Sequence, residues 1–298
     1  IIICPCRDCK GGTHKLCVKI SAVSEKCSKT PFAPARQNFR FILSERALRV
    51  IIYQLKYINR EDNPLEREKV LVSAEETARQ KEYMDKVRAL HERRTTKPLA
   101  YVHTYGCQQN VADGERLMGM LREMGCEFTD DTKRADIVLM NTCAIRENAE
   151  KTVYGMLGQL THTKAANPDQ IICLCGCMAQ QPRVAEKVKT SYRHVDLVLG
   201  PQAEWRFPEL LYRAYTERGR VFSIDDEPGR IAEDIPVYRV GGVSAWVSIM
   251  YGCNTFCSYC IGPYVRGRER SREPEKILEE VRQLSQAGDK ELTRLGQP

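Results

Sequence analysis

The sequence contains no apolar run that approaches the ~18 residues needed to cross a membrane. It also lacks a basic segment ahead of the short apolar start Ile1–Ile3, so we expect no secretory leader. These two absences argue against the membrane-spanning and secreted classes. We therefore expect a cytoplasmic protein that has no membrane partner.

Cysteine, by contrast, is abundant, with 14 among 298 residues. Thiols of a protein without a leader stay reduced, so this number indicates metal binding and not a disulfide scaffold. The formal net charge of +7 fits a polyanionic partner such as RNA, but enzymes without such a partner can be equally basic. At ~100–200 residues per domain, the length suggests roughly two domains.

Three cysteines lie close together at C-x3-C-x2-C spacing: Cys253, Cys257 and Cys260. A structural zinc site needs four ligands, usually from paired C-x2-C knuckles, and no second pair follows this loop. Three thiolates on one short loop can instead hold three irons of a [4Fe–4S] cluster. The fourth iron then stays open and can bind a cofactor or substrate.

This loop resembles the signature of the radical S-adenosylmethionine (AdoMet) enzymes. The resemblance implies that AdoMet chelates the open iron, and that one electron from the cluster cleaves it to methionine and a 5′-deoxyadenosyl radical. The cofactors then carry out the difficult chemistry, and the protein positions and shields them. The resemblance also places Tyr259 beside the AdoMet adenine and implies an electron donor such as flavodoxin or ferredoxin.

The hydrophobic pattern predicts an α/β fold. Strands are expected at 99–104, 136–141, 170–175 and 195–200, with helices around 117–124, 149–160, 184–189 and 204–216. Strands that are apolar throughout and separated by helices indicate a doubly wound parallel sheet. A strand at 245–250, a helix from Pro274 to Gly288 and a strand at 291–295 indicate the start of a partial (β/α) barrel.

We divide the chain into five segments. They are an unassigned extension that need not be native coding sequence (1–60), a charged helical extension (61–97), an N-terminal sheet domain (98–222), a Pro- and Gly-containing linker (223–243) and a truncated radical AdoMet core (244–298). The first segment holds five cysteines and one histidine: Cys4, Cys6, Cys9, Cys17, Cys27 and His14. Cys4, Cys6, Cys9 and His14 could form a zinc site, but we interpret the cysteines as incidental.

A second set of cysteines shares one placement. Cys107, Cys143 and Cys177 each follow one of the first three predicted strands. Loops after the carboxyl ends of parallel strands converge at one edge of a sheet, so these thiols should meet there. A lone cysteine is usually a small buried hydrophobe, but three at equivalent points indicate a second open [4Fe–4S] cluster. We interpret the remaining ones of this region as core residues: Cys126, Cys173 and Cys175.

Four motifs carry a closer resemblance. They are Thr104-Tyr-Gly-Cys-Gln-Gln-Asn110, Asn141-Thr-Cys-Ala-Ile-Arg-Glu-Asn-Ala149, Gly176-Cys-Met-Ala-Gln180 and the C-x3-C-x2-C loop. In this order they resemble the methylthiotransferase family, over about residues 98–297. The resemblance implies two [4Fe–4S] clusters and two AdoMet molecules. One AdoMet methylates a sulfur held at the cluster of Cys107, Cys143 and Cys177, and the other is cleaved at the second cluster.

Within that family, residues 141–150 and 249–253 most resemble the tRNA branch. Residues 263–272 also fit this branch, as a basic loop that either contacts phosphates or cofactor or is simply solvated. The implied reaction is methylthiolation at carbon 2 of N6-isopentenyladenosine beside the anticodon, by a monomeric enzyme. Because members of the family continue beyond the last residues of this sequence, we expect a fragment that is inactive by itself.

Other functions remain open from the residues alone. The substrate could be a threonylcarbamoyl-modified tRNA adenosine or an aspartate of a ribosomal protein, because short motifs do not define a pocket. From other classes, a non-catalytic iron–sulfur scaffold would carry the same cysteines. The spacing disfavours a zinc-bound RNA module.

Overall fold

The structure is a computed structural model that describes residues 71–145, 147–217, 219–224, 229–239 and 244–296, and the backbone of β1 (Phe41–Ile42). All of these residues belong to one compact unit, residues 39–298. Except for β1, the expectations for residues 1–70 lie outside the described residues, as do those for parts of the 223–243 linker.

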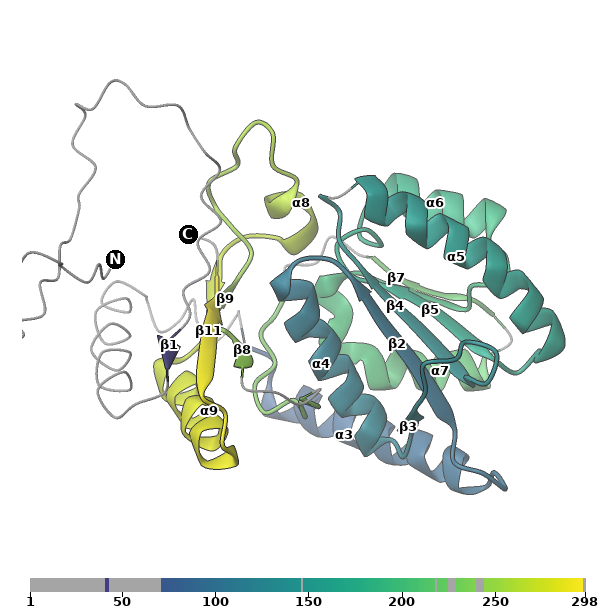
Figure 1. Cartoon of the computed structure of the whole chain (residues 1–298), viewed down its shortest axis with the longest axis horizontal. Coiled ribbons are helices and arrows are strands. Elements are labelled where there is room, and N and C mark those ends of the chain that lie inside the picture. Colours follow the sequence, from purple (N-terminus) through teal and green to yellow (C-terminus); the bar gives the residue numbers. More distant parts are fainter. Residues whose placement is uncertain are drawn as a thin grey trace, which may run out of the picture. The chain divides into compact units, whose positions relative to one another are not determined.

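A six-stranded, fully parallel sheet forms the larger α/β part, with the strand order β3-β2-β4-β5-β6-β7 (Figure 1). Its strands are β2 (Leu99–Tyr105), β3 (Glu127–Phe128), β4 (Ile137–Thr142), β5 (Ile171–Cys175), β6 (Leu197–Leu199) and β7 (Val221–Ser223). Every residue of β4, β5 and β6 is buried, which accounts for their continuous apolar sequences. The predicted fold class is confirmed.

Helices cover both faces of this sheet (Figure 1). On one face α4 (Gln108–Glu123) and α7 (Phe207–Thr216) share a core in which Leu117, Leu121 and Phe207 are fully buried or nearly so. On the other face α5 (Glu147–Ala166) and α6 (Pro182–Ser191) form a second core around Val153, Leu157 and Val188. The helix predicted at 204–216 is interrupted, since a 3-10 turn, η1 (Pro201–Arg206), precedes α7.

The charged helix α3 (Ala74–Glu92) packs against α7 and α4. It begins with a capping box between Ser73 and Glu76. At its end His91 is buried, and its ring nitrogens contact the Met124 carbonyl at 2.7 Å through Nδ1 and the Tyr215 hydroxyl at 3.2 Å through Nε2. Burial lowers the pKa of His91 below its ordinary value.

A smaller sheet belongs to the C-terminal part. In it β8 (Ser244–Ser248) and β11 (Glu291–Leu295) pair in parallel, and β1 is antiparallel to β11. Helix α9 (Pro274–Ala287) connects the two parallel strands and buries Ile277 and Val281 against Val247. The predicted strand at 245–250 is broken after Ser248, and β9 (Met250–Tyr251) pairs instead with β10 (Arg270–Ser271). The short helix α8 (Gly262–Arg266) lies between β9 and β10.

Among the helices of the described ranges, none combines the length and the apolar composition needed to cross a membrane.

Candidate functional site

The order of the large sheet reverses between β2 and β4. From β2 the chain passes through α4 to β3 at one edge, and it then enters β4 on the opposite side of β2. In open parallel sheets, ligands bind outside the carboxyl ends of the strands at such a point. Cys107 lies two residues after β2, and Cys143 directly follows β4. These two cysteines therefore flank the reversal point of the sheet.

The structure brings the predicted first set of thiols together. The Cys143 N–H donates to the Tyr105 carbonyl at 2.8 Å, which joins the end of β2 to the loop after β4. Contact with the Cys143 thiol, followed by burial, raises the pKa of the Cys107 thiol. Burial also raises the pKa of Cys177, the cysteine after β5, and the Cys107 sulfur acts in the same direction. Only 6% of Cys177 is exposed.

Two buried amides connect the loops that carry these cysteines. Asn110 donates through Nδ2 to Asn141 Oδ1 at 3.1 Å, and Asn141 Nδ2 donates to the Asn110 carbonyl at 2.7 Å. The Cys107 thiol donates to Asn110 Oδ1 at 3.2 Å. Beside Cys177, Gly176 has φ +90°, and a Cβ there would collide with Asn141 Oδ1. Asn141 thus lies against all three loops, a role that its place in a sequence motif did not reveal.

The second set, Cys253, Cys257 and Cys260, lies on the loop between β9 and α8. The loop begins at Gly252, where φ is +75° and a Cβ would collide with the Arg268 carbonyl. Phe256 takes a left-handed conformation with φ 47°, which is uncommon for a residue with a side chain. The Cys260 N–H donates to the Cys257 carbonyl at 2.9 Å. These constraints shape the loop, and the last of them joins Cys257 to Cys260 directly.

Both sets have hydrogen-bond donors aimed at sulfur. The backbone N–H groups of Ile145, Thr255 and Gly262 lie 3.4, 3.4 and 3.3 Å from the sulfurs of Cys143, Cys253 and Cys260, respectively. Hydrogen bonds to the sulfurs are among the features that set the reduction potential of iron–sulfur clusters. Two all-thiol donor sets with N–H donors at the sulfurs fit iron–sulfur clusters.

Within the described part of the chain, no group of three or more His, Cys, Asp or Glu side chains converges on a point suited to one metal ion. A cluster of four irons and four sulfides is wider than a single ion, so the thiols that hold it stand further apart. Tyr259 extends from the loop of the second set and is 90% exposed. Its side chain is thus accessible to a ligand bound over that loop.

Comparison with known proteins agrees with this arrangement. Residues 99–200 match the family described as "Uncharacterized protein family UPF0004", and residues 247–297 match the radical SAM superfamily. Each match contains one of the two cysteine sets. The tRNA-2-methylthio-N(6)-dimethylallyladenosine synthase of Acetivibrio thermocellus is 50% identical over 236 residues, which cover 78% of this chain and 49% of that protein.

Over 78% of its length, the chain is thus similar to a tRNA-2-methylthio-N(6)-dimethylallyladenosine synthase. Synthases of the same name from Clostridioides difficile and Halalkalibacterium halodurans are 43% and 48% identical over 235 and 196 residues. These alignments cover 78% and 66% of this chain, and 49% and 36% of the two relatives. The chain thus spans about half the length, or less, of these relatives.

The basic loop at 263–272 differs from the expectation. Of its four arginines, only Arg268 is exposed, so the loop is not simply solvated, and the other three arginines do not form an exposed surface for phosphates. Arg266 forms an ion pair with Asp113 at 2.7 Å. Arg272 pairs with Glu233 at 2.6 Å. Arg270 donates to the Arg266 carbonyl at 2.7 Å. Through these contacts the loop mainly joins parts of the protein to one another.

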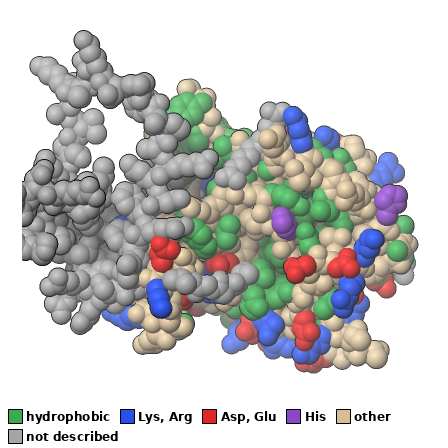
Figure 2. Space-filling view, in the orientation of Figure 1, with side chains coloured by type: hydrophobic (Ala, Val, Ile, Leu, Met, Phe, Trp, Pro, Cys, Tyr) green, Lys and Arg blue, Asp and Glu red, His purple; other side chains and the backbone are tan. Residues whose placement is uncertain are grey.

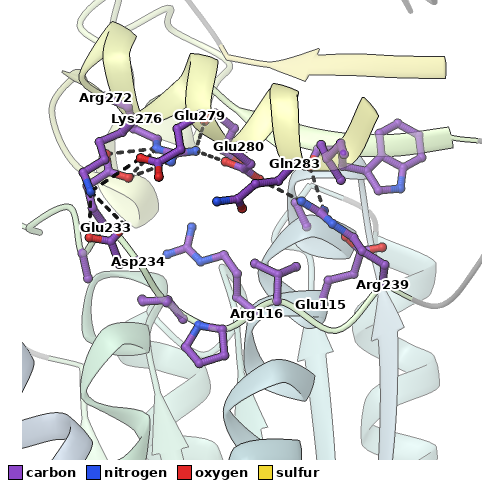
Figure 3. A pocket seen from close by; sticks show the side chains of 18 of the residues that line it. Glu115, Arg116, Glu233, Asp234, Arg239, Arg272, Lys276, Glu279, Glu280 and Gln283 are labelled. Atoms are coloured by element: carbon purple, nitrogen blue, oxygen red, sulfur yellow. Dashed lines mark hydrogen bonds and ion pairs between the residues drawn. The ribbon is translucent and has the colours of Figure 1, made fainter. Parts of the chain in front are cut away.

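A cavity of about 690 Å³ lies between α4, residues 232–239 and the β8–α9 unit (Figure 3). Arg239 reaches Glu115 at 2.6 Å and Glu280 at 2.8 Å, and Arg272 also reaches Glu280, at 2.7 Å. Because these charges pair with one another across the cavity, its wall attracts a polyanion weakly. On the face in Figure 2, Lys and Arg side chains are likewise interspersed with Asp and Glu around α3 and α4.

Proposed function

We propose that the intact protein is a radical AdoMet methylthiotransferase of tRNA. Its substrate would be N6-isopentenyladenosine beside the anticodon, and its product 2-methylthio-N6-isopentenyladenosine. The observation that carries this proposal is the presence of two separate three-cysteine sets, one at the reversal point of a parallel sheet and one on the loop after β9. The names of the relatives support the substrate and argue for tRNA over a ribosomal protein.

We assign each set one [4Fe–4S] cluster. Cys107, Cys143 and Cys177 would hold the first, and Cys253, Cys257 and Cys260 the second. When bound, the clusters and AdoMet supply the electron, the organic radical and the methyl group, which protein side chains cannot supply. The chain itself holds the thiolates in place, directs N–H groups at sulfurs of both sets, and buries Cys143 and Cys177 of the first set. Tyr259 would lie beside the AdoMet adenine.

The substrate class follows from the same proposal. An unpaired anticodon loop can turn a base out of its stack toward a reactive centre, which suits chemistry on carbon 2 of adenine. A flavodoxin or ferredoxin would supply the electrons. We also propose that the enzyme is a cytoplasmic monomer. A scaffold without catalysis would carry the same cysteines but would not cleave AdoMet.

Nucleoside mass spectrometry of tRNA tests the function directly. A strain without the intact gene should lose 2-methylthio-N6-isopentenyladenosine and accumulate N6-isopentenyladenosine. The intact wild-type gene should restore the product, whereas genes with Cys143→Ala or Cys257→Ala should not. An unchanged nucleoside pattern in the deletion strain would rule out the proposed substrate. A failure of the purified, iron-loaded protein to release 5′-deoxyadenosine from AdoMet would favour the scaffold.

A further inference from the structure

Arg266 contacts the first cysteine set although it belongs to the part of the chain that carries the second. It is the last residue of α8, six positions after Cys260. Its Nε donates to the Cys177 sulfur at 3.0 Å, across 89 positions of sequence. Its Nη2 lies 2.7 Å from Asp113 Oδ2 on α4. The side chains of Arg266 and Asp113 are 13% and 3% exposed, so both charges are shielded from solvent.

The residue after Arg266 contacts the other set. The Gly267 carbonyl accepts a hydrogen bond from the Cys253 N–H at 3.1 Å. Gly267 has φ +75°, a conformation that favours glycine and turns the chain sharply after α8. Two consecutive residues thus touch one cysteine from each set. A displacement of Arg266 would therefore affect the positions of cysteines in both sets.

Geometry gives the arginine two tasks that lysine cannot combine. The planar guanidinium donates to Cys177 from one nitrogen and pairs with Asp113 through another, whereas a lysine ammonium is a single point charge. The guanidinium stays charged at all relevant pH values. Asp113 compensates this charge in a buried setting, where an unpaired ion would be strongly unfavourable.

We propose that Arg266 is a positioning residue that couples the two cysteine sets and tunes the group held by Cys177. This inference rests on the proposed function, in which Cys107, Cys143 and Cys177 hold an iron–sulfur cluster. Hydrogen bonds to the sulfurs help to set the reduction potential of such a cluster. A buried positive donor stabilises the more negatively charged, reduced form, so loss of Arg266 should make the potential of this cluster more negative.

The test uses the intact protein with Cys253, Cys257 and Cys260 replaced by Ala, so that signals come from the first set alone. After anaerobic reconstitution, a redox titration followed by electron paramagnetic resonance gives the potential. Arg266→Gln should shift it to a more negative value. Arg268→Gln is the matched control, because Arg268 is an exposed arginine two positions away, and it should leave the potential unchanged.

Equal potentials in the iron-loaded Arg266→Gln and Arg268→Gln proteins would overturn the inference. If the Arg266→Gln protein loses its iron, the same redox titration is carried out on the Arg266→Lys protein. If the Arg266→Lys protein keeps its iron and has a more negative potential than the protein that retains Arg266, the positioning role is supported. If its potential is unchanged, the role is refuted. Wild-type protein that binds no iron at the first set would instead overturn the proposed function, and this inference with it.

Discussion

Asn110 and Asn141 exchange two hydrogen bonds across the reversal point of the sheet, one between their side chains and one from the Asn141 amide to the Asn110 carbonyl. Both residues are fully buried. The pair ties the start of α4, which carries Cys107, to the end of β4, which leads to Cys143. The geometry of the first cysteine set therefore depends on amides that are not themselves ligands.

Replacement of Asn141 should weaken both the fold and the first cysteine set. Asn141→Ala leaves buried groups of Asn110 unsatisfied, at a cost of roughly 1–3 kcal/mol for each one. Urea unfolding of the apoprotein measures the free energy of unfolding. Iron analysis after anaerobic reconstitution measures how much iron the first cysteine set binds. The control Gln159→Ala removes an exposed amide on α5 and should change neither. Equal effects of the two variants would show that the amide pair is not important.

Two glycines should respond to alanine in opposite ways. Gly176→Ala places a Cβ against Asn141 Oδ1 and the Thr142 backbone and imposes a left-handed alanine. The conformation costs about 1–2 kcal/mol and the overpacking about 1–3 more. Gly155 lies within α5 with open space around it, so Gly155→Ala should stabilise by roughly 0.5–1 kcal/mol. Thermal unfolding compares the stability of the two variants. A Gly176→Ala protein as stable as wild type would contradict the close contact between Gly176 and Asn141.

Glu280 should be the most sensitive charged residue of the cavity in Figure 3, since it accepts from both Arg239 and Arg272. Glu280→Gln removes the charge that holds these arginines, and we expect a loss of about 1.5–3 kcal/mol in unfolding free energy. The neighbouring Glu279 lies 4.0 Å from Lys276 on an exposed surface. Glu279→Gln should stay within about 0.5 kcal/mol of wild type. A Glu280→Gln protein as stable as that control would be evidence against the ion-pair network.

His91 should make stability depend on pH. Because burial lowers its pKa from an ordinary value of 6.5, the unfolded chain takes up a proton that the folded chain does not. The stabilisation is complete above about pH 6.5 and is lost as the pH falls toward the folded pKa. His91→Asn, which does not titrate, should lose less stability between pH 7.5 and 5.5 than wild type. His162→Asn changes an exposed histidine and should keep the wild-type slope. Urea unfolding at each pH gives the comparison.

Iron content should separate the two cysteine sets in this 298-residue chain. The first set lies on a complete six-stranded sheet, whereas the second lies beside a sheet of only three strands in the described residues. Metal binding requires a folded pocket. Replacing Cys107, Cys143 and Cys177 with Ala should therefore remove more iron than replacing Cys253, Cys257 and Cys260. Equal losses would show that the two sets do not differ in this way.

Local pattern was sufficient for much of the structure. The buried strands β4, β5 and β6 can be recognised in the sequence as apolar runs. Helix α9 can be recognised by the Pro at its start and by Gly288 after its end, which has φ +98° in the structure. These signals depend on neighbours within a few positions, so sequence alone carries them. The edge strands β3 and β7 were not predicted, because two and three residues are too few to show a period.

The sequence by itself determined which residues are available as ligands. It shows the spacing of the cysteines in the second set and the recurrence of the first-set cysteines after successive strands. Only the tertiary structure decided what surrounds them. In the sequence, Arg266 is one more cation of a basic loop, and only folding places it against Cys177. Asn141 is likewise only the end of a predicted strand in the sequence, and its contact with Asn110 forms when α4 packs against it. Such contacts join residues tens of positions apart, and the burial that gives them their strength exists only once the layers have packed.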